Sequence, residues 1–225
     1  MKKTISNDQQ ILNATLHESD RYGNRDDAAG MATKLPMAID RMHELGFCSS
    51  FLDYGTGKGK LLNYLKKYSN HPIQIDGYDP AVKQFGEKPN HKYDIVSCLD
   101  VLEHIELDTI DNVLSEISQY TINFCYLVID LQPAVKTLAD GRNAHILLAP
   151  SDWWQAKVSR YFSAYSTFPV YHQSGDIQKV AFVGSNNSKC LRAMHGFINK
   201  LDIFEIELQQ GILDKKYKYQ KQMNK

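Results

Sequence analysis

The sequence predicts an α/β fold, in which helices cover a mostly parallel β-sheet. Short apolar runs alternate along the chain with segments of helical periodicity, as expected for strand–helix–strand units. The run at 123–129 has the apolar character of a central strand that is buried on both faces. Near the C-terminus, two apolar runs flank Ser174-Gly175-Asp176, which favours an antiparallel hairpin.

The first fifty residues are expected to be helical. Pro36 suits the first residue of a helix, and Gly46 follows the last turn of that helix. Its side chains include apolar Ile39 and Met42 beside charged Asp40, so the helix should be half-buried. It either packs over the ligand edge of the sheet as a lid or is an additional packing helix.

The elements of the sheet follow in order. We expect strands at 51–54, 73–78, 94–99, 123–129, 167–172 and 179–184, because each is a short apolar run. Apolar residues recur at helical spacing over 61–68, 107–117 and 154–162. Ser151 precedes the last of these helices and is a candidate N-cap.

Length, charge and cysteine content exclude several classes of protein. The 225 residues suit one domain with a small extension, and no stretch approaches the ~18 apolar residues of a membrane span. Because 26 basic residues balance 26 acidic ones, a nucleic-acid partner is not expected. The start of the chain lacks the apolar region of a signal peptide, so we expect a cytoplasmic protein. The four cysteines do not have metal-ligand spacing, so we expect buried thiols and no metal.

The most informative segment is a strand followed by a turn with three alternating glycines, over 51–59. Glycine permits positive φ angles and lets a ligand approach the backbone closely. Asp79 comes 20 residues after Gly59, at the end of the next expected strand. A carboxylate there can accept hydrogen bonds from two ribose hydroxyls. Together these features predict a ligand that contains a nucleoside.

The spacing of the glycines narrows the choice of ligand. Phosphate loops need Ser or Thr after Gly-Lys, but Gly59 follows Lys58 here, which disfavours ATP. The dinucleotide fingerprint has two residues between its last glycines, whereas this turn has one. Asp53 would repel a pyrophosphate but can hold an ammonium group. S-adenosylmethionine fits, because it has a ribose and a positive amino group but no phosphate.

The stretch from Phe51 to about Gly184 resembles the class I S-adenosylmethionine-dependent methyltransferases. Residues 53–59 resemble the first motif of these enzymes, and 76–80 resemble the second. Residues 93–105 are similar to the fourth-strand motif of the ubiquinone-biosynthesis-like, small-molecule branch. The segment 136–145, followed by Trp153-Trp154, resembles a little-described bacterial and phage subgroup.

This resemblance implies a doubly wound, Rossmann-like sheet of six or seven strands. It implies a methyltransferase domain over 47–205, a helical segment over 1–46 that packs on or caps the cofactor site, and a basic helix or tail over 206–225. Family members usually have a helix and a third strand before the fourth strand, but the segment 81–92 is too short for both. The usual adenine-contacting acid has no clear match, so adenine contacts must come from Leu99-Asp100, nearby apolar side chains or the N-terminal segment.

The resemblance also implies the site residues. The residues expected to bind the cofactor are Asp53, Gly55, Thr56, Gly57, Gly59, Asp79, Leu99 and Asp100. On the acceptor side, His145 is the first candidate for a general base, and His104 is either a second candidate or a capping residue.

Three further residues are candidates for binding the acceptor. Arg142 can clamp an anionic group and Asn143 lies next to it, although both residues would equally suit a loop fixed by local hydrogen bonds. Trp153 either forms a wall of the acceptor pocket or packs in the core with Trp154.

We therefore expect methyl transfer from S-adenosylmethionine to a small-molecule or saccharide acceptor. Oxygen is the favoured acceptor atom because of His145 and because the Asn-Pro-Pro-Tyr type of motif used by nucleic-acid amino methylases is absent. Two alternatives stay open. The chain could bind the cofactor without transfer, or it could methylate a macromolecule that the basic tail recruits.

Overall fold

The structure is a computed structural model that describes residues 3–19, 31–171 and 175–203. Its core is a six-stranded sheet with the order β2-β1-β3-β4-β6-β5. The strands are β1 (Ser50–Tyr54), β2 (Gln74–Tyr78), β3 (Tyr93–Leu99), β4 (Thr121–Asp130), β5 (Ala164–Tyr171) and β6 (Ile177–Ser185). Strands β1 to β4 run parallel, and β6 is antiparallel to both β4 and β5. The predicted α/β fold with an antiparallel C-terminal pair is confirmed.

The described residues form six α-helices and three short 3₁₀ helices in addition to the strands. The α-helices are α1 (Asn7–His17), α2 (Leu35–Glu44), α3 (Lys60–Tyr68), α4 (Ile110–Tyr120), α5 (Ser151–Val158) and α6 (Leu191–Leu201). The 3₁₀ helices are η1 (Lys83–Phe85), η2 (Leu102–His104) and η3 (Ser188–Cys190). Between β2 and β3 the chain forms only η1, because so short a segment has no room for a further helix and strand. The sheet therefore has six strands, with β2 at one edge and β5 at the other.

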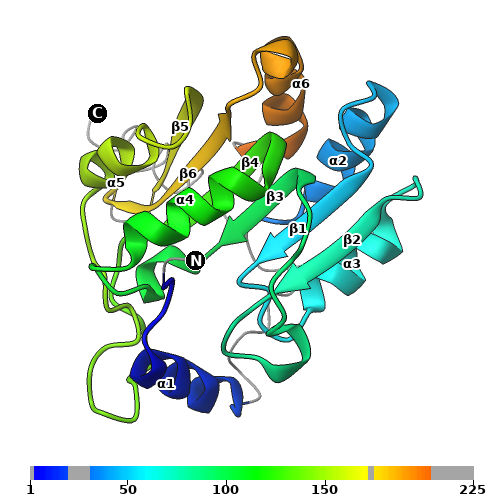
Figure 1. Cartoon of the computed structure of the whole chain (residues 1–225). Helices are drawn as coiled ribbons and strands as arrows, with labels where there is room; N and C mark the ends of the chain where they lie inside the picture. The colour runs from blue at the N-terminus through cyan, green and yellow to red at the C-terminus, as the bar shows by residue number, and fades with distance from the viewer. Residues whose placement is uncertain (1–2, 20–30, 172–174, 204–225) are drawn as a thin grey trace, which may run out of the picture.

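Helices cover both faces of the sheet (Figure 1). Successive side chains of a strand point to opposite faces, and this alternation divides the core in two. Phe51 and Phe124 belong to the core formed with α2, α3 and α6. Leu52 and Cys125, their chain neighbours, belong to the core formed with α4 and α5.

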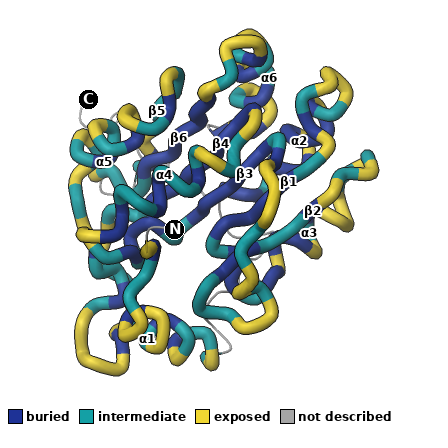
Figure 2. Tube along the Cα trace, viewed as in Figure 1, coloured by how far each residue is buried: buried dark blue, intermediate teal, exposed yellow. Residues whose placement is uncertain are grey.

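Strand β4 contains the longest run of buried residues among the described strands. Each residue from 124 to 129 is at most 1% exposed, which confirms the predicted central strand. Figure 2 shows that burial is concentrated in β1, β3 and β4, while exposed residues cluster in the loops and outer helix faces. The four cysteines lie buried as thiols, as predicted.

The two N-terminal helices have different positions. Helix α2 packs against α6, with Ile39 and Met42 fully buried while Met37 is 53% exposed, so the half-buried helix is confirmed. Helix α1 instead lies at the edge of the sheet where β1, β2 and β3 end (Figure 1). The backbone N–H of Ser6 donates to the carboxylate of Glu106 at 2.8 Å, which holds the start of α1 at this edge.

One local prediction is wrong. Ser151 is the first residue of α5 rather than its N-cap, because Pro150 occupies the cap position and no side chain caps the helix. The Ser151 hydroxyl instead accepts a hydrogen bond from Gln155 Nε2 at 3.3 Å.

Three predicted features lie partly or wholly outside the described residues. They are the end of the strand expected at 167–172, part of the expected hairpin turn, and the basic segment 206–225.

The sequence predicted no membrane-spanning segment, and the helices of the structure can be compared with that prediction. No helix in the described part of the chain combines the length and apolar character that a membrane crossing requires.

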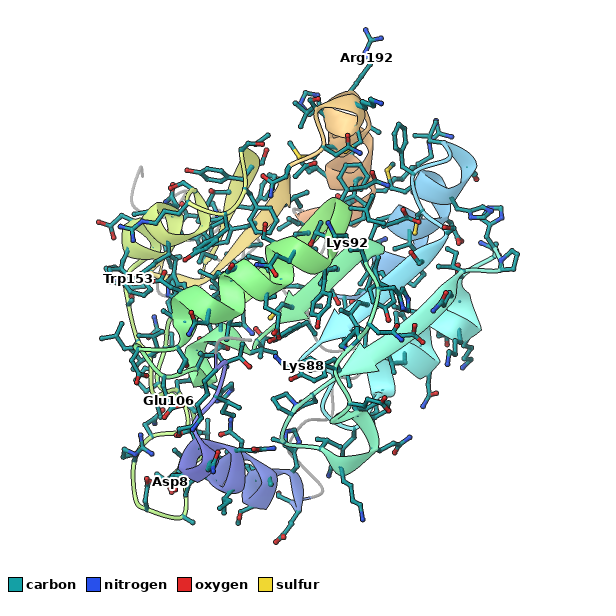
Figure 3. All side chains as sticks on the ribbon, viewed as in Figure 1. Asp8, Lys88, Lys92, Glu106, Trp153 and Arg192 are labelled. Atoms are coloured by element: carbon teal, nitrogen blue, oxygen red, sulfur yellow. The ribbon has the colours of Figure 1, made fainter. Side chains whose placement is uncertain are left out.

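The contact between α6 and β4 makes a stability prediction. Phe197 and Phe124 are fully buried, and their rings stack with centroids 5.4 Å apart. Phe197→Ala should lower the free energy of unfolding by about 3–5 kcal/mol, because it leaves a cavity in this core. Arg192→Ala on the same helix should change it by less than about 0.5 kcal/mol, since Arg192 points away from the protein (Figure 3). Equal losses in urea denaturation would contradict this packing.

Candidate functional site

The glycine turn joins β1 to α3 in the predicted way. Gly55, Gly57 and Gly59 have φ angles of 78°, 56° and 72°, in the left-handed region that disfavours side chains. The carbonyl oxygen of Tyr78, the last residue of β2, accepts hydrogen bonds from the N–H groups of Gly55 (2.7 Å) and Thr56 (3.2 Å). The end of β2 thus fixes the turn that follows β1.

Asp79 connects these two strand ends. It is 7% exposed, and its Oδ2 accepts a hydrogen bond from the Gly57 N–H at 2.9 Å. Its Oδ1 accepts from the N–H of Ala81, also at 2.9 Å. His17 at the end of α1 places its Nε2 3.8 Å from Asp79 Oδ2. Burial lowers the pKa of His17, against the opposing effect of the Asp79 charge.

Two polar groups are buried close to the turn. Asp53 is fully buried in β1, and its Oδ1 accepts a hydrogen bond from Ser97 Oγ at 2.7 Å. Thr56 is 3% exposed, and its Oγ1 has no hydrogen-bond partner among the residues that the structure describes. Buried hydroxyls are normally satisfied, so the turn offers a polar group to a ligand.

The end of β3 carries a strained residue. Leu99, the last residue of β3, is 1% exposed. Asp100 follows with a φ angle of 52°, which is uncommon for a residue with a side chain. Its carboxylate accepts from Lys179 Nζ at 2.8 Å, and Asp130 lies 3.5 Å from the same ammonium. Although burial opposes them, these carboxylates raise the pKa of Lys179.

The structure brings together the two histidines that the sequence suggested separately. The rings of His104 and His145 meet edge to face, with centroids 4.8 Å apart. Glu103 lies beside them and is fully buried; its Oε1 is 4.0 Å from His145 Nε2. Burial raises the pKa of Glu103 well above its usual value. Burial and the neighbouring His145 lower the pKa of His104 to about 4.

Arg142 and Asn143 make hydrogen bonds within and beside their own loop. Arg142 Nε donates to Asp140 Oδ2 at 2.7 Å, and its Nη2 donates to Gln9 Oε1 of α1 at 3.2 Å. Asn143 Oδ1 accepts from the backbone N–H of His145 at 2.9 Å. These contacts fix the shape of the loop after β4 and connect it to α1.

A pocket of about 500 Å³ lies beside the end of β4. Its wall consists of Leu131, Gln132, Leu148, Ala149, Pro150, Ser151 and Ile177. It is next to the histidine pair, because the carbonyl oxygen of Gln132 lies 2.5 Å from His145 Nδ1.

The two tryptophans of α5 do not line this pocket. Trp153 is not part of the pocket wall but is half-buried against the core formed with α4 and α5, with Lys157 Nζ 5.2 Å from its ring centroid (Figure 3). Its ring meets the fully buried Trp154 edge to face at 4.9 Å.

Helix α1 crosses the edge of the sheet between the glycine turn and the loop after β4. Ser19, just after α1, receives hydrogen bonds from both sides. Lys58 Nζ donates to its carbonyl oxygen and Lys136 Nζ donates to its hydroxyl, each at 2.7 Å. Helix α1 and Ser19 therefore lie over the polar ends of β1, β2, β3 and β4.

Comparison with known proteins agrees with this geometry. Residues 18–154, more than half of the chain, match the model of a family described as "Methyltransferase domain". No curated protein matches the chain.

Two solved structures share the fold at low sequence identity. One is an O-methyltransferase family protein from Burkholderia thailandensis, with a TM-score of 0.51 and 12% identity over 70% of this chain and 56% of that one. The other is 1,6-didemethyltoxoflavin-N1-methyltransferase from the same organism, with bound 1,6-didemethyltoxoflavin and S-adenosylhomocysteine. Its TM-score is 0.54 and its identity 13%, over 82% of this chain and 92% of that one.

The glycine turn makes a prediction that separates backbone strain from crowding. A Cβ atom at Gly55 would lie 2.7 Å from Val101 Cγ1, whereas at Gly46, with a similar φ of 76°, it would meet nothing within 4 Å. Gly46→Ala should lower the free energy of unfolding by about 1–2 kcal/mol through strain alone. Gly55→Ala should lose about 1–3 kcal/mol more through crowding. Equal losses in urea denaturation would show that the turn has room for a side chain.

Proposed function

The chain belongs to the methyltransferase domain family and is a class I S-adenosylmethionine-dependent methyltransferase, and on that premise we propose that it methylates a small molecule at oxygen. The observation that carries the cofactor part of this proposal is the junction of Asp79 with the glycine turn. It lies at the carboxyl ends of parallel strands, where open α/β sheets bind their ligands. S-adenosylmethionine supplies a methyl group that its sulfonium has already activated.

The residues at this edge fit the cofactor. In our proposal Asp79 accepts hydrogen bonds from the two ribose hydroxyls, and the glycines let the ligand reach the backbone. The buried hydroxyl of Thr56, which has no partner in the described part of the chain, gives the ligand a further hydrogen bond. Asp53 favours the positive amino group, and Leu99 with Asp100 borders the adenine.

Helix α1 supports the same proposal from the N-terminal side. Its contacts with Asp79 and with the loops after β1 and β4 place it over the polar strand ends. We propose that it covers the bound cofactor and excludes water, which favours transfer in an oriented, desolvated site. The segment 1–46 thus contributes a packing helix, α2, and a covering helix, α1.

The acceptor side is proposed to be the pocket beside the end of β4. Five of its seven wall residues are apolar, and only Gln132 and Ser151 have polar side chains. Such a wall favours a compact, partly apolar acceptor over a saccharide, which would leave many hydroxyls without partners. His145 and His104 border this side and suit an acceptor with a hydroxyl group. The contacts of Arg142, Asn143 and Trp153 favour a role in shaping this region.

The cofactor assignment makes the first functional prediction. Asp79→Asn should weaken S-adenosylmethionine binding by about 10- to 150-fold, the equivalent of about 1.5–3 kcal/mol, because the ribose loses its charged acceptor. Asp76→Asn is the matched control, since Asp76 lies on β2, the strand that Asp79 follows, with its side chain 41% exposed. Calorimetry that finds equal affinity in a folded Asp79→Asn variant would reject the assignment.

The second functional prediction concerns the pocket beside the end of β4. The protein is incubated with methyl-labelled S-adenosylmethionine and a panel of small hydroxylated aromatic compounds and saccharides. We expect the label in the aromatic compounds and not in the saccharides. Leu148→Arg, in the pocket wall, should raise the KM for such an acceptor by at least about tenfold while leaving cofactor affinity unchanged. Val135→Arg is the control, because Val135 is fully exposed and outside the wall. Unchanged KM in Leu148→Arg would place the acceptor elsewhere.

A further inference from the structure

Three potential metal ligands converge at the ends of β3 and β4. Glu103 and His104 belong to η2, directly after β3, and His145 belongs to the loop after β4. One ligand atom from each side chain lies within 4.8 Å of the other two. We propose that these three side chains bind one divalent transition-metal ion. The sequence alone predicted no metal, because it gives no sign that these positions meet.

Both histidines are held in the orientation that metal ligands need. His104 Nδ1 lies 2.7 Å from the carbonyl oxygen of Ala144, and His145 Nδ1 lies 2.5 Å from that of Gln132. A carbonyl oxygen only accepts hydrogen bonds, so each Nδ1 carries the proton and each Nε2 carries the lone pair. Histidine ligands are typically fixed in this manner, through the ring nitrogen that does not bind the metal.

Glu103 supplies an independent indication of a ligand. The residue has no exposed surface, and its Oε2 has no hydrogen-bond partner within the described ranges 3–19, 31–171 and 175–203. Its Oε1 lies 4.0 Å from His145 Nε2. A buried carboxyl oxygen without a partner destabilises a fold, so such groups are rare in native proteins unless they bind a ligand or act in catalysis. A cation between the two imidazoles would satisfy it.

The donor set indicates the class of ion. Two imidazole nitrogens and one carboxylate oxygen suit Zn²⁺, Co²⁺, Ni²⁺ or Fe²⁺, whereas Mg²⁺ and Ca²⁺ prefer oxygen ligands. Bonds of about 2.0–2.1 Å place tetrahedral ligands about 3.3 Å apart, so the ligand atoms need to approach one another by at most about 1.5 Å. Three protein ligands leave a position for water or, if the proposed function holds, for an acceptor oxygen from the adjoining pocket.

The test measures metal binding directly, without any transfer assay. Full-length protein freed of metal by a chelator is titrated with Zn²⁺ by calorimetry and with Co²⁺ by visible absorption. We expect one ion per chain and the visible bands of low-coordinate Co²⁺. His145→Ala and Glu103→Gln should each weaken binding by at least about 100-fold. Glu103→Gln keeps the size of the buried side chain, and circular dichroism verifies the fold of both variants.

A second histidine pair provides the control for adventitious binding. His43 and His71 stack with centroids 4.5 Å apart, and Glu44 lies 3.9 Å from His71 Nε2. His71→Ala should leave the affinity unchanged. Absence of stoichiometric binding, full binding in His145→Ala or Glu103→Gln, or loss of binding in His71→Ala would each overturn the proposal. S-adenosylmethionine affinity, measured on the same samples, should be equal in all three variants, so a failed metal site remains distinguishable from a failed cofactor site.

Discussion

The hydrogen bond from the Gly57 N–H to the buried carboxylate of Asp79 is the constraint on which the site depends. It joins the turn after β1 to the residue after β2, and it requires backbone with a positive φ angle. The same carboxylate lies 3.8 Å from His17 Nε2, so it also contacts the end of α1. One buried charge thereby organises three segments that are distant in sequence, in the place where a ribose is expected to bind.

The parallel part of the sheet determines where the chemistry is located. Because β1 to β4 run in one direction, their polar ends meet at one edge, and the antiparallel β6 contributes Lys179 to the same region. The short connection through η1 leaves β2 as the edge strand on the parallel side of the sheet. Gln10 of α1 donates to the carbonyl oxygen of Pro80 just beyond β2, so the N-terminal helix approaches this shortened side.

Local features could be predicted from the sequence, and long-range ones could not. The glycine turn and Asp79 are encoded by residue type and spacing within one strand–helix–strand unit, so both were predictable. The meeting of His104 with His145 depends on the pairing of β3 with β4 and on the path of a long loop. The contact of Arg142 with Gln9 depends on where α1 docks. No periodic pattern in the sequence predicts that either pair of residues is in contact.

The central claim is that Asp79 and the glycine turn bind the nucleoside part of S-adenosylmethionine beneath α1. A crystal structure of the full-length protein with S-adenosylhomocysteine tests it most directly. The account predicts both ribose hydroxyls within hydrogen-bond distance of the Asp79 carboxylate, with the ligand against Gly57 and the adenine beside Leu99 and Asp100. A ligand bound elsewhere, with Asp79 contacting only Gly57, Ala81 and His17, would contradict it.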